Sequence, residues 1–337
     1  MDMTAAVLRG VGDLSLRRVP RPEPGPGEVL LKVEANTICG TDLRIISGAK
    51  TAGVRPGVIM GHEFAGRVAA VGDGVEGVDV GVQATCSIVL SCGRCVRCLA
   101  GREHLCESLR LFGYEIDGGM AEYLLVPREA MERGNLVLAP RELEPTTLAL
   151  AEPVSCCLNG ARQFRVRPGD SVAVLGTGPK LAGATRIVAV GRPGRLDPAV
   201  ELGATHALSA QGEDLTREVL RLTGGGADVA VVAVGDPALA DQALQIAAIG
   251  GRVNYFAGFP KGSTALMEPN VIHYRELQVT GGSNARRADV RRAVELLSSG
   301  ALDVASLVTH RFPLAEIDAA IAAVRQRAGL KVAVVPS

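Results

Sequence analysis

Hydrophobic residues follow two different patterns along the chain, and the change falls near residue 152. Before it, short apolar and β-branched runs at 29–33, 66–71 and 121–126 alternate with glycine- and proline-rich stretches such as 22–27. Short strands separated by frequent turn residues are typical of small β barrels and sandwiches. The first part of the chain is therefore predicted to form a small, barrel-like β domain.

Beyond residue 152, apolar strands alternate with helical stretches. Strands are expected at 171–175, 186–190, 228–234 and 251–256. This alternation predicts an α/β domain with a parallel sheet whose strands are connected by crossover helices. The chain then ends with expected helices at 289–299 and 314–325 and a terminal strand at 331–335.

The length and charge of the chain limit what it can be. At 337 residues it exceeds one ordinary domain core, so two domains are expected. Its 36 basic and 36 acidic residues cancel, which argues against nucleic acid or an anionic membrane as a partner and favours a small polar ligand. No run approaches the ~20 apolar residues of a membrane span, and residues 1–26 lack the features of a secretory signal, so a cytoplasmic protein is expected.

Four of the cysteines form a compact motif. Cys92, Cys95 and Cys98 follow one another at intervals of three residues, and Cys106 comes shortly afterwards. Four thiolates so close together suit a tetrahedral zinc ion with every coordination position filled. We expect a structural zinc site, because a closed site leaves no position for substrate. A redox pair or a set of unpaired surface cysteines is the alternative.

A second set of metal-binding side chains is scattered in the sequence. Cys39 precedes Gly-Thr-Asp, His62 and Glu63 are adjacent, and Glu152 precedes a proline. One thiolate, one imidazole and one carboxylate, with the fourth position left to water or substrate, are typical of a catalytic zinc site. Taken separately, a histidine beside a glutamate is more often an ordinary core or surface pair.

The order of these motifs resembles the zinc-dependent medium-chain alcohol dehydrogenases. The two zinc motifs are followed by Glu152-Pro and then by Gly176-Thr-Gly-Pro, in the family's order and near its spacing, and the resemblance covers nearly the whole chain. It implies a GroES-like catalytic domain formed by 1–153 and 282–337, with the zinc lobe at about 91–107, and a doubly wound Rossmann domain at 154–281. It also implies a homodimer or homotetramer.

The resemblance assigns roles to the scattered residues. Cys39 and His62 correspond to direct ligands of the catalytic zinc. Glu152 stands where the sorbitol dehydrogenase-like branch has an acidic residue in place of a cysteine, which favours polyol substrates. A carboxylate is a harder ligand than a thiolate and binds the metal directly or through water. Glu63 corresponds to a carboxylate that either exchanges with another residue as a zinc ligand or contacts the ligands without binding the zinc itself.

Two further residues of the first motif are expected to support the reaction. Thr41 corresponds to the hydroxyl that relays the substrate proton, and Asp42 to a residue that orients the zinc-bound histidine. Arg44 departs from the family, because many members have a histidine there as the outer base and an arginine stays protonated. The proton is expected to leave by another route, such as water.

The strand at 171–175 leads into a glycine-rich turn of Gly176, Thr177, Gly178 and Pro179. A pyrophosphate normally meets backbone N–H groups at this point, at a helix N-terminus. The third glycine of the fingerprint is missing, and the next strand already begins at 186, whereas a βαβ crossover takes at least ~10 to 12 residues. Either the first Rossmann helix is shortened, which would weaken dinucleotide binding, or the sequence after Pro179 is incomplete.

The end of the second strand points to the preferred cofactor. Gly191 is followed by Arg192, and the acidic residue that accepts the ribose 2′-hydroxyl in NAD-specific sites is missing. Arg192 and Arg195 are expected to meet a 2′-phosphate, which favours NADP over NAD. Gly235, after the strand at 228–234, is expected to line the same cofactor cleft.

These features predict a zinc-dependent oxidoreductase with two zinc ions per chain. It would transfer a hydride between a nicotinamide cofactor and a secondary alcohol or ketone of a polyol, sugar alcohol or related polar compound. One alternative is an NADP-linked biosynthetic reductase that acts on a cyclitol or sugar ketone. An alternative of another class is a zinc-binding scaffold that has lost cofactor binding. The fold by itself does not identify the substrate.

Overall fold

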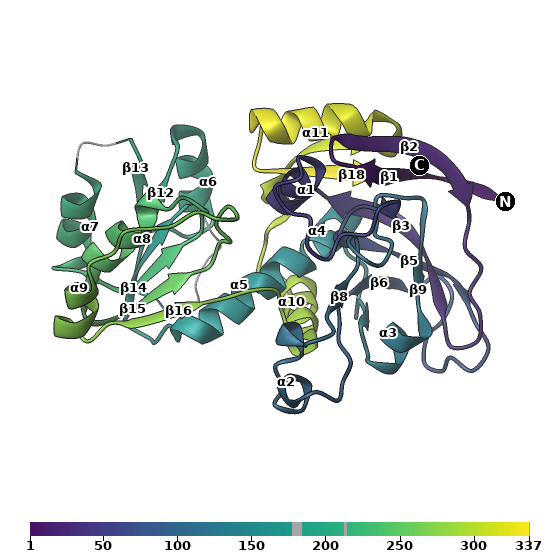
Figure 1. Ribbon diagram of the computed structural model, residues 1–337, viewed down its shortest axis with the longest axis horizontal. Helices are drawn as coiled ribbons and strands as arrows, with labels where there is room; N and C mark the ends of the chain where they lie inside the picture. Colours follow the sequence, from purple (N-terminus) through teal and green to yellow (C-terminus); the bar gives the residue numbers. More distant parts are fainter. Residues whose placement is uncertain (177–183, 212–213, 337) are drawn as a thin grey trace. The chain divides into compact units, whose positions relative to one another are not determined.

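A computed structural model describes residues 1–176, 184–211 and 214–336 of the chain, which forms two compact units (Figure 1). The discontinuous unit comprises Met1–Ser155 and Asn284–Ser337, and the central unit comprises Cys156–Ser283. The first boundary falls inside the helix α5 (Ala151–Phe164), so Glu152 belongs to the discontinuous unit.

The discontinuous unit is built mainly from β-strands. Its strands are β1 (Asp2–Gly10), β2 (Asp13–Pro20), β3 (Val29–Thr37), β4 (Val58–Ile59), β5 (Glu63–Val71), β6 (Gln83–Cys86), β7 (Val89–Leu90), β8 (Arg110–Leu111), β9 (Tyr123–Val126), β10 (Leu136–Leu138), β17 (Val308–Pro313) and β18 (Lys331–Val335). The largest sheet has the order β10-β6-β5-β3-β18-β17, and β9 also pairs with β3. A second sheet has the order β2-β1-β4, and β7 pairs with β8. The β-rich domain expected from the sequence is confirmed.

Short helices connect and cover these strands. They are α1 (Gly40–Ile46), α2 (Val96–Leu99), η1 (Glu103–Leu105), α3 (Arg128–Glu132), α4 (Pro145–Ala149), α10 (Arg287–Ser299), η3 (Ala305–Leu307), η4 (Leu314–Glu316) and α11 (Ile317–Gln326). The helix expected at 314–325 therefore begins as a turn of 3₁₀ helix and becomes α-helical at Ile317.

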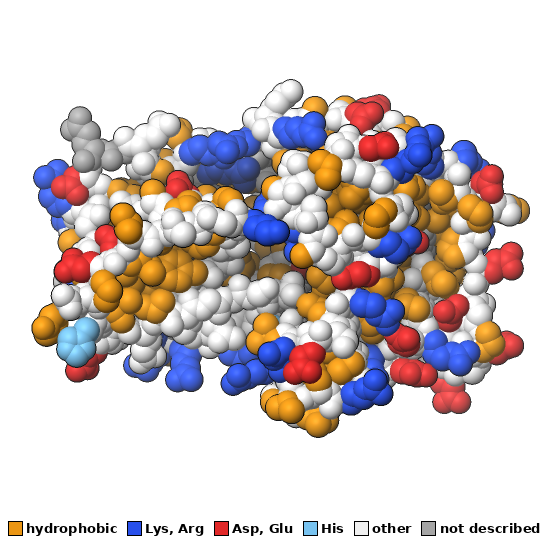
Figure 2. Space-filling view, in the orientation of Figure 1, with side chains coloured by type: hydrophobic (Ala, Val, Ile, Leu, Met, Phe, Trp, Pro, Cys, Tyr) orange, Lys and Arg blue, Asp and Glu red, His pale blue; other side chains and the backbone are white. Residues whose placement is uncertain are grey.

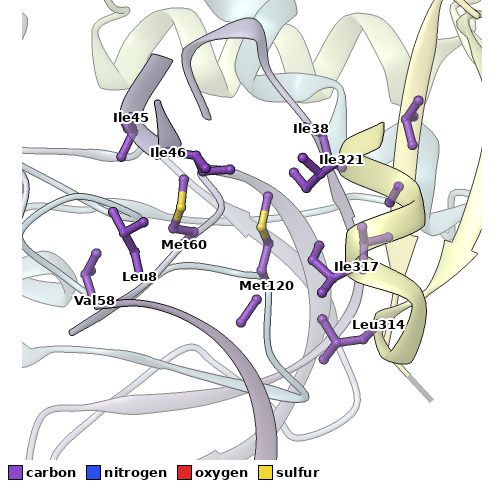
Figure 3. Close-up of a cluster of buried hydrophobic side chains, with 14 of the residues drawn as sticks. Leu8, Ile38, Ile45, Ile46, Val58, Met60, Met120, Leu314, Ile317 and Ile321 are labelled. Atoms are coloured by element: carbon purple, nitrogen blue, oxygen red, sulfur yellow. The ribbon is translucent and has the colours of Figure 1, made fainter. Parts of the chain in front are cut away.

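One buried cluster joins the two ends of the chain in this unit. Met60 and Met120 pack with Ile317 and Ile321 of α11, and Leu8 of β1 lies in the same cluster (Figure 3). Burial of each such side chain contributes roughly 1.5–3 kcal/mol. The C-terminal strand β18 also pairs antiparallel with β3, so the end of the chain is part of the N-terminal sheet.

The central unit is a parallel sheet with helical crossovers. Its strands are β11 (Ser171–Leu175), β12 (Arg186–Gly191), β13 (His206–Ser209), β14 (Ala227–Val232), β15 (Ala247–Tyr255) and β16 (Gln278–Gly281). Their order is β13-β12-β11-β14-β15-β16, and every neighbouring pair is parallel. This is the strand order of the Rossmann fold, so the predicted doubly wound sheet is confirmed.

The crossovers of this sheet are η2 (Pro193–Arg195), α6 (Leu196–Glu201), α7 (Leu215–Thr223), α8 (Ala238–Gln245) and α9 (Pro269–Tyr274). Helix α7 shows why such segments are helical. The Asp214 carboxylate caps its start by accepting from the Arg217 N–H at 3.0 Å, and Gly224 ends it at φ +77°. Both are standard helix signals.

The first crossover is short. Strands β11 and β12 are parallel neighbours, with Ser171 opposite Arg186, so residues 176–185 make the whole connection. In the sequence as given, ten residues lie between Leu175 and Arg186. Residues 177–183, with the predicted cofactor residues Thr177, Gly178 and Pro179, lie outside the described residues.

Two features bear on partners. Among the described helices, none is both long and apolar enough to cross a membrane. On the face shown in Figure 2, basic and acidic side chains are interspersed, in keeping with their equal numbers in the sequence.

Candidate active site and zinc lobe

The sulfur atoms of the four lobe cysteines lie close together in the structure. The sulfur of Cys98 lies 3.9 Å from that of Cys92 and 3.5 Å from that of Cys95, and Cys95 lies 3.9 Å from Cys106. Four thiolates around one zinc at ~2.3 Å would be about 3.8 Å apart, so these separations fit tetrahedral coordination. The donor set therefore fits a zinc ion with no open position.

Two thiols of the lobe have pKa values shifted in opposite directions. Backbone N–H groups of Glu107 and Cys98 lower the pKa of Cys95 to about 6, whereas burial and the neighbouring thiols raise the pKa of Cys98 to about 11. A divalent cation would stabilise all four thiolates together, since metal binding requires the deprotonated form.

Side chains from distant elements hold the lobe. The Glu103 carboxylate accepts from the backbone N–H of Arg287, at the start of α10, at 3.1 Å. The Arg287 guanidinium donates to the Ser91 hydroxyl at 3.1 Å, and Arg133 donates to the Cys92 carbonyl at 2.8 Å. The lobe is thus attached to the C-terminal part of the discontinuous unit.

The second candidate metal site lies where β3 ends and β5 begins. Thr37, the last residue of β3, pairs with Glu63, the first residue of β5. This pairing places Cys39, two residues beyond β3, next to His62 and Glu63. One ligand atom from each of these three residues lies within 4.8 Å of the other two. The sheet register brings together residues that the sequence separates.

Asp42 positions His62. Its Oδ1 lies 3.2 Å from Nδ1 of His62, both side chains are almost fully buried, and Oδ2 accepts from the Cys39 N–H at 2.8 Å. Burial opposes a charge on His62, but the Asp42 carboxylate, with the Cys39 thiol, raises its pKa well above the ordinary value. Because Nδ1 faces Asp42, Nε2 is the nitrogen left to bind a metal, as in many metal-ligating histidines.

Glu152 is not one of the three residues whose ligand atoms converge. It is 8 % exposed and occupies the first turn of α5. Burial raises the pKa of Tyr114, and the negative charges of Asp42, Cys39 and Glu152 add to that effect. Glu152 is therefore near enough to act electrostatically on the residues around His62.

Both oxygens of Glu63 already have partners. Lys331 Nζ lies 2.7 Å from Oε1 and 2.6 Å from Oε2, and the Thr37 hydroxyl also donates to Oε2. Glu63 is 1 % exposed, so Lys331 balances a buried negative charge. Thr41, in the first turn of α1, and Arg44, in its last turn, are both half-buried.

The described cofactor residues share one edge of the central sheet. Gly191 is the last residue of β12, and Gly176 and Gly235 follow β11 and β14. All three lie at the carboxyl ends of their strands, the edge where parallel α/β sheets bind ligands. Gly176 has φ +100°, and a side chain there would meet Val234 at 2.5 Å. Arg192, directly after β12, is exposed, and Arg195, the last residue of η2, is half-buried.

Comparison with known proteins identifies the family. Residues 25–134 match the alcohol dehydrogenase GroES-like domain, and residues 175–299 match the zinc-binding dehydrogenase domain. An L-threonine 3-dehydrogenase of Bacillus licheniformis is 34% identical to this chain, and the alignment covers 99% of each of the two chains. The chain belongs to the zinc-dependent medium-chain alcohol dehydrogenase family.

Solved structures of other dehydrogenases agree. A zinc-binding dehydrogenase from Sinorhizobium meliloti 1021, bound to NADP, has a TM-score of 0.92 at 35% identity, with full coverage of both chains. The 2R,3R-butanediol dehydrogenase of Bacillus subtilis has a TM-score of 0.88 at 31% identity, over 99% of this chain and 100% of the other. The family and fold predicted from the sequence are confirmed, and this dehydrogenase acts on alcohols as an oxidoreductase.

Three residues near the dehydrogenase site were not foreseen. Thr37 and Lys331 hold Glu63, and the ring of Tyr114 packs 5.5 Å from that of His62. Apolar strands often begin with a lysine, so the sequence around Lys331 does not indicate that this residue lies near the site. Thr37 lies only two residues before Cys39, and its nearness to a candidate ligand was the one available hint.

Proposed function

We propose that this dehydrogenase oxidises a secondary alcohol of a polyol, sugar alcohol or related polar compound, or reduces the matching ketone. The proposal rests on one observation: the ligand atoms of Cys39 and His62 converge, with Asp42 orienting the histidine. We take the buried Glu152, whose charge acts on Tyr114 beside His62, as the third ligand. The names of the relatives support it, because L-threonine and butanediol both carry a secondary hydroxyl next to another polar group.

Cys39, His62 and Glu152 would hold the catalytic zinc, and the four lobe cysteines a second, structural zinc. A zinc ion at the first site supplies a Lewis acid that lowers the pKa of the alcohol hydroxyl. Glu63 supplies negative charge behind these ligands and is held there by Lys331 and Thr37.

The reaction moves a hydride from the alcohol carbon to the oxidised nicotinamide and releases the hydroxyl proton. Thr41 accepts that proton through its side-chain oxygen and passes it outward. Arg44 cannot accept it, because a guanidinium stays protonated. Water therefore completes the route to solvent.

NADP is the proposed cofactor. Arg192 and Arg195 follow β12 where an NAD-specific site has a carboxylate, and the Sinorhizobium relative is bound to NADP. Comparing kcat/KM for NADP and NAD tests this, and a clear preference for NAD would reject it. A cytoplasmic location and a homodimer or homotetramer stay predictions.

A screen of polyols, amino alcohols and ketones with both cofactors tests the proposed reaction. Zinc content is measured on the same preparation. Turnover that is lost on substitution of Cys39 supports the proposal. If a fluorescence titration shows no cofactor binding at millimolar concentration, the proposed enzymatic function is rejected in favour of a zinc-binding scaffold.

A further inference from the structure

Tyr114 lies beside the proposed zinc site. The centroid of its ring is 5.5 Å from that of the His62 ring, and the two planes are inclined at 55°, which is ordinary aromatic contact. Tyr114 is 5 % exposed and belongs to the buried cluster that contains Met60 and Met120 (Figure 3). Lys50 Nζ lies 5.3 Å from the centroid of the same ring. Close packing and this cation–π contact hold the ring in one place relative to His62.

The close approach of two backbone segments produces this arrangement. Gly113 adopts φ +78°, and a side chain there would meet the carbonyl oxygen of Gly61 at 2.7 Å. The same carbonyl accepts from the Gly119 N–H at 2.9 Å, which holds the second segment against the first. Gly61 and Gly113 each directly precede one of the two ring residues, so their contact brings the rings together.

The hydroxyl of Tyr114 is free to bind a ligand. Among the described residues, none donates a hydrogen bond to this hydroxyl or accepts one from it. The oxygen is also not one of the fully buried polar atoms that lack a partner, so the small exposed part of the side chain includes it. A tyrosine hydroxyl both donates and accepts, and a buried tyrosine usually finds a partner for it.

This hydroxyl also lies near the other groups of the site. Burial raises its pKa, and charges of the proposed zinc site act on it as well, namely those of His62, Asp42, Cys39 and Glu152. Electrostatic influence falls with distance, which agrees with the contact between the two rings. An alcohol held at His62 would therefore have the hydroxyl of Tyr114 next to it.

We propose that the Tyr114 hydroxyl binds a second hydrogen-bonding group of the substrate, a hydroxyl or an amine on the carbon next to the one that is oxidised. The inference rests on the proposed function, since it takes the reacting hydroxyl to be held at Cys39, His62 and Glu152. A phenol hydroxyl suits either group, because it donates to an oxygen and accepts from an ammonium. Vicinal diols and amino alcohols are then preferred to simple secondary alcohols, which leave the phenol unpaired.

Three compounds with one carbon skeleton test this: 2,3-butanediol, 3-amino-2-butanol and 2-butanol. We expect the holoenzyme to oxidise one of the first two with a higher kcat/KM than 2-butanol, and the preferred compound shows whether the second group is a hydroxyl or an amine. Tyr114→Phe keeps the ring and should lower that preference about tenfold, with an unchanged melting temperature. Tyr274→Phe, at an exposed position of the central unit, is the matched control and should keep the preference.

The contrary results are distinct. A wild-type enzyme without the preference, or the same preference in Tyr114→Phe, would overturn the inference and leave the proposed function intact. An equal fall in kcat/KM for all three compounds would also overturn it, because the hydroxyl would then act on the reaction and not on the second group.

Binding decides the inference if none of the three compounds is oxidised. Ligand-observed NMR on the zinc-loaded protein compares their affinities without turnover. Tighter binding of the diol or the amino alcohol than of 2-butanol, lost in Tyr114→Phe, supports the inference, and equal or absent binding rejects it. The proposed function fails separately, if no alcohol or ketone of the wider screen is turned over.

Discussion

Lys331 Nζ lies 2.7 and 2.6 Å from the two carboxylate oxygens of Glu63, although 268 residues separate the two in the chain. Strand β18 carries Lys331 and lies against β3, which ends at Thr37 and pairs there with Glu63. The C-terminal strand therefore supplies the cation that balances a carboxylate next to the proposed catalytic ligands.

Lys331→Met should destabilise the protein. It leaves the Glu63 carboxylate buried without its cation, which typically costs about 3 kcal/mol or more. Urea unfolding measures the change, and Lys32→Met, which removes an exposed lysine from the same sheet, should have little effect. The double variant Lys331→Met/Glu63→Gln should recover part of the loss, because it removes the unpaired charge. Wild-type stability of Lys331→Met would show that the pair does not stabilise the fold.

Asp42→Asn should weaken only the catalytic zinc site. The carboxylate that orients His62 is lost, and such partners typically contribute about 10- to 100-fold in metal affinity. Zinc content after dialysis against a chelator should fall from two ions per chain toward one, with the lobe zinc retained. Asp79→Asn, at an exposed position, is the control. Retention of both ions through the dialysis would remove Asp42 from this role.

Thr41→Ala should lower turnover at saturating substrate without loss of zinc. The hydroxyl is proposed to relay the substrate proton, and such groups contribute roughly 100-fold or more to rate. Thr41→Ser keeps the hydroxyl and should retain most of the activity. Full kcat in Thr41→Ala would exclude Thr41 from the proton path.

Cys98→Ala should remove the structural zinc. Three thiolates remain, and the lobe loses the ion that holds Cys92, Cys95 and Cys106 together. We expect one zinc ion per chain, a lower melting temperature and an unchanged kcat per catalytic zinc. A proportional loss of kcat with intact catalytic zinc would mean that the lobe acts on the chemistry.

The hydrophobic pattern of the sequence predicted the limits of some elements correctly. The strands β11 and β18 have the limits expected from the sequence, because each is a short apolar run bounded by turn residues. The hydrophobic periodicity also predicted the helix near the C-terminus. It could not predict that residues Leu314–Glu316 form a 3₁₀ turn, because the geometry at a helix end depends on local hydrogen bonds.

The sequence by itself determined the family, the two-unit plan and the four-cysteine lobe, because local spacing and motif order carry that information. Only the tertiary structure decided which residues surround Glu63 and His62. Lys331 reaches Glu63 through the pairing of β18 with β3, and Tyr114 reaches both His62 and Lys50 through packing. Contacts between segments far apart in the chain depend on sheet register and side-chain packing, and neither leaves a periodic trace in the residues that make them.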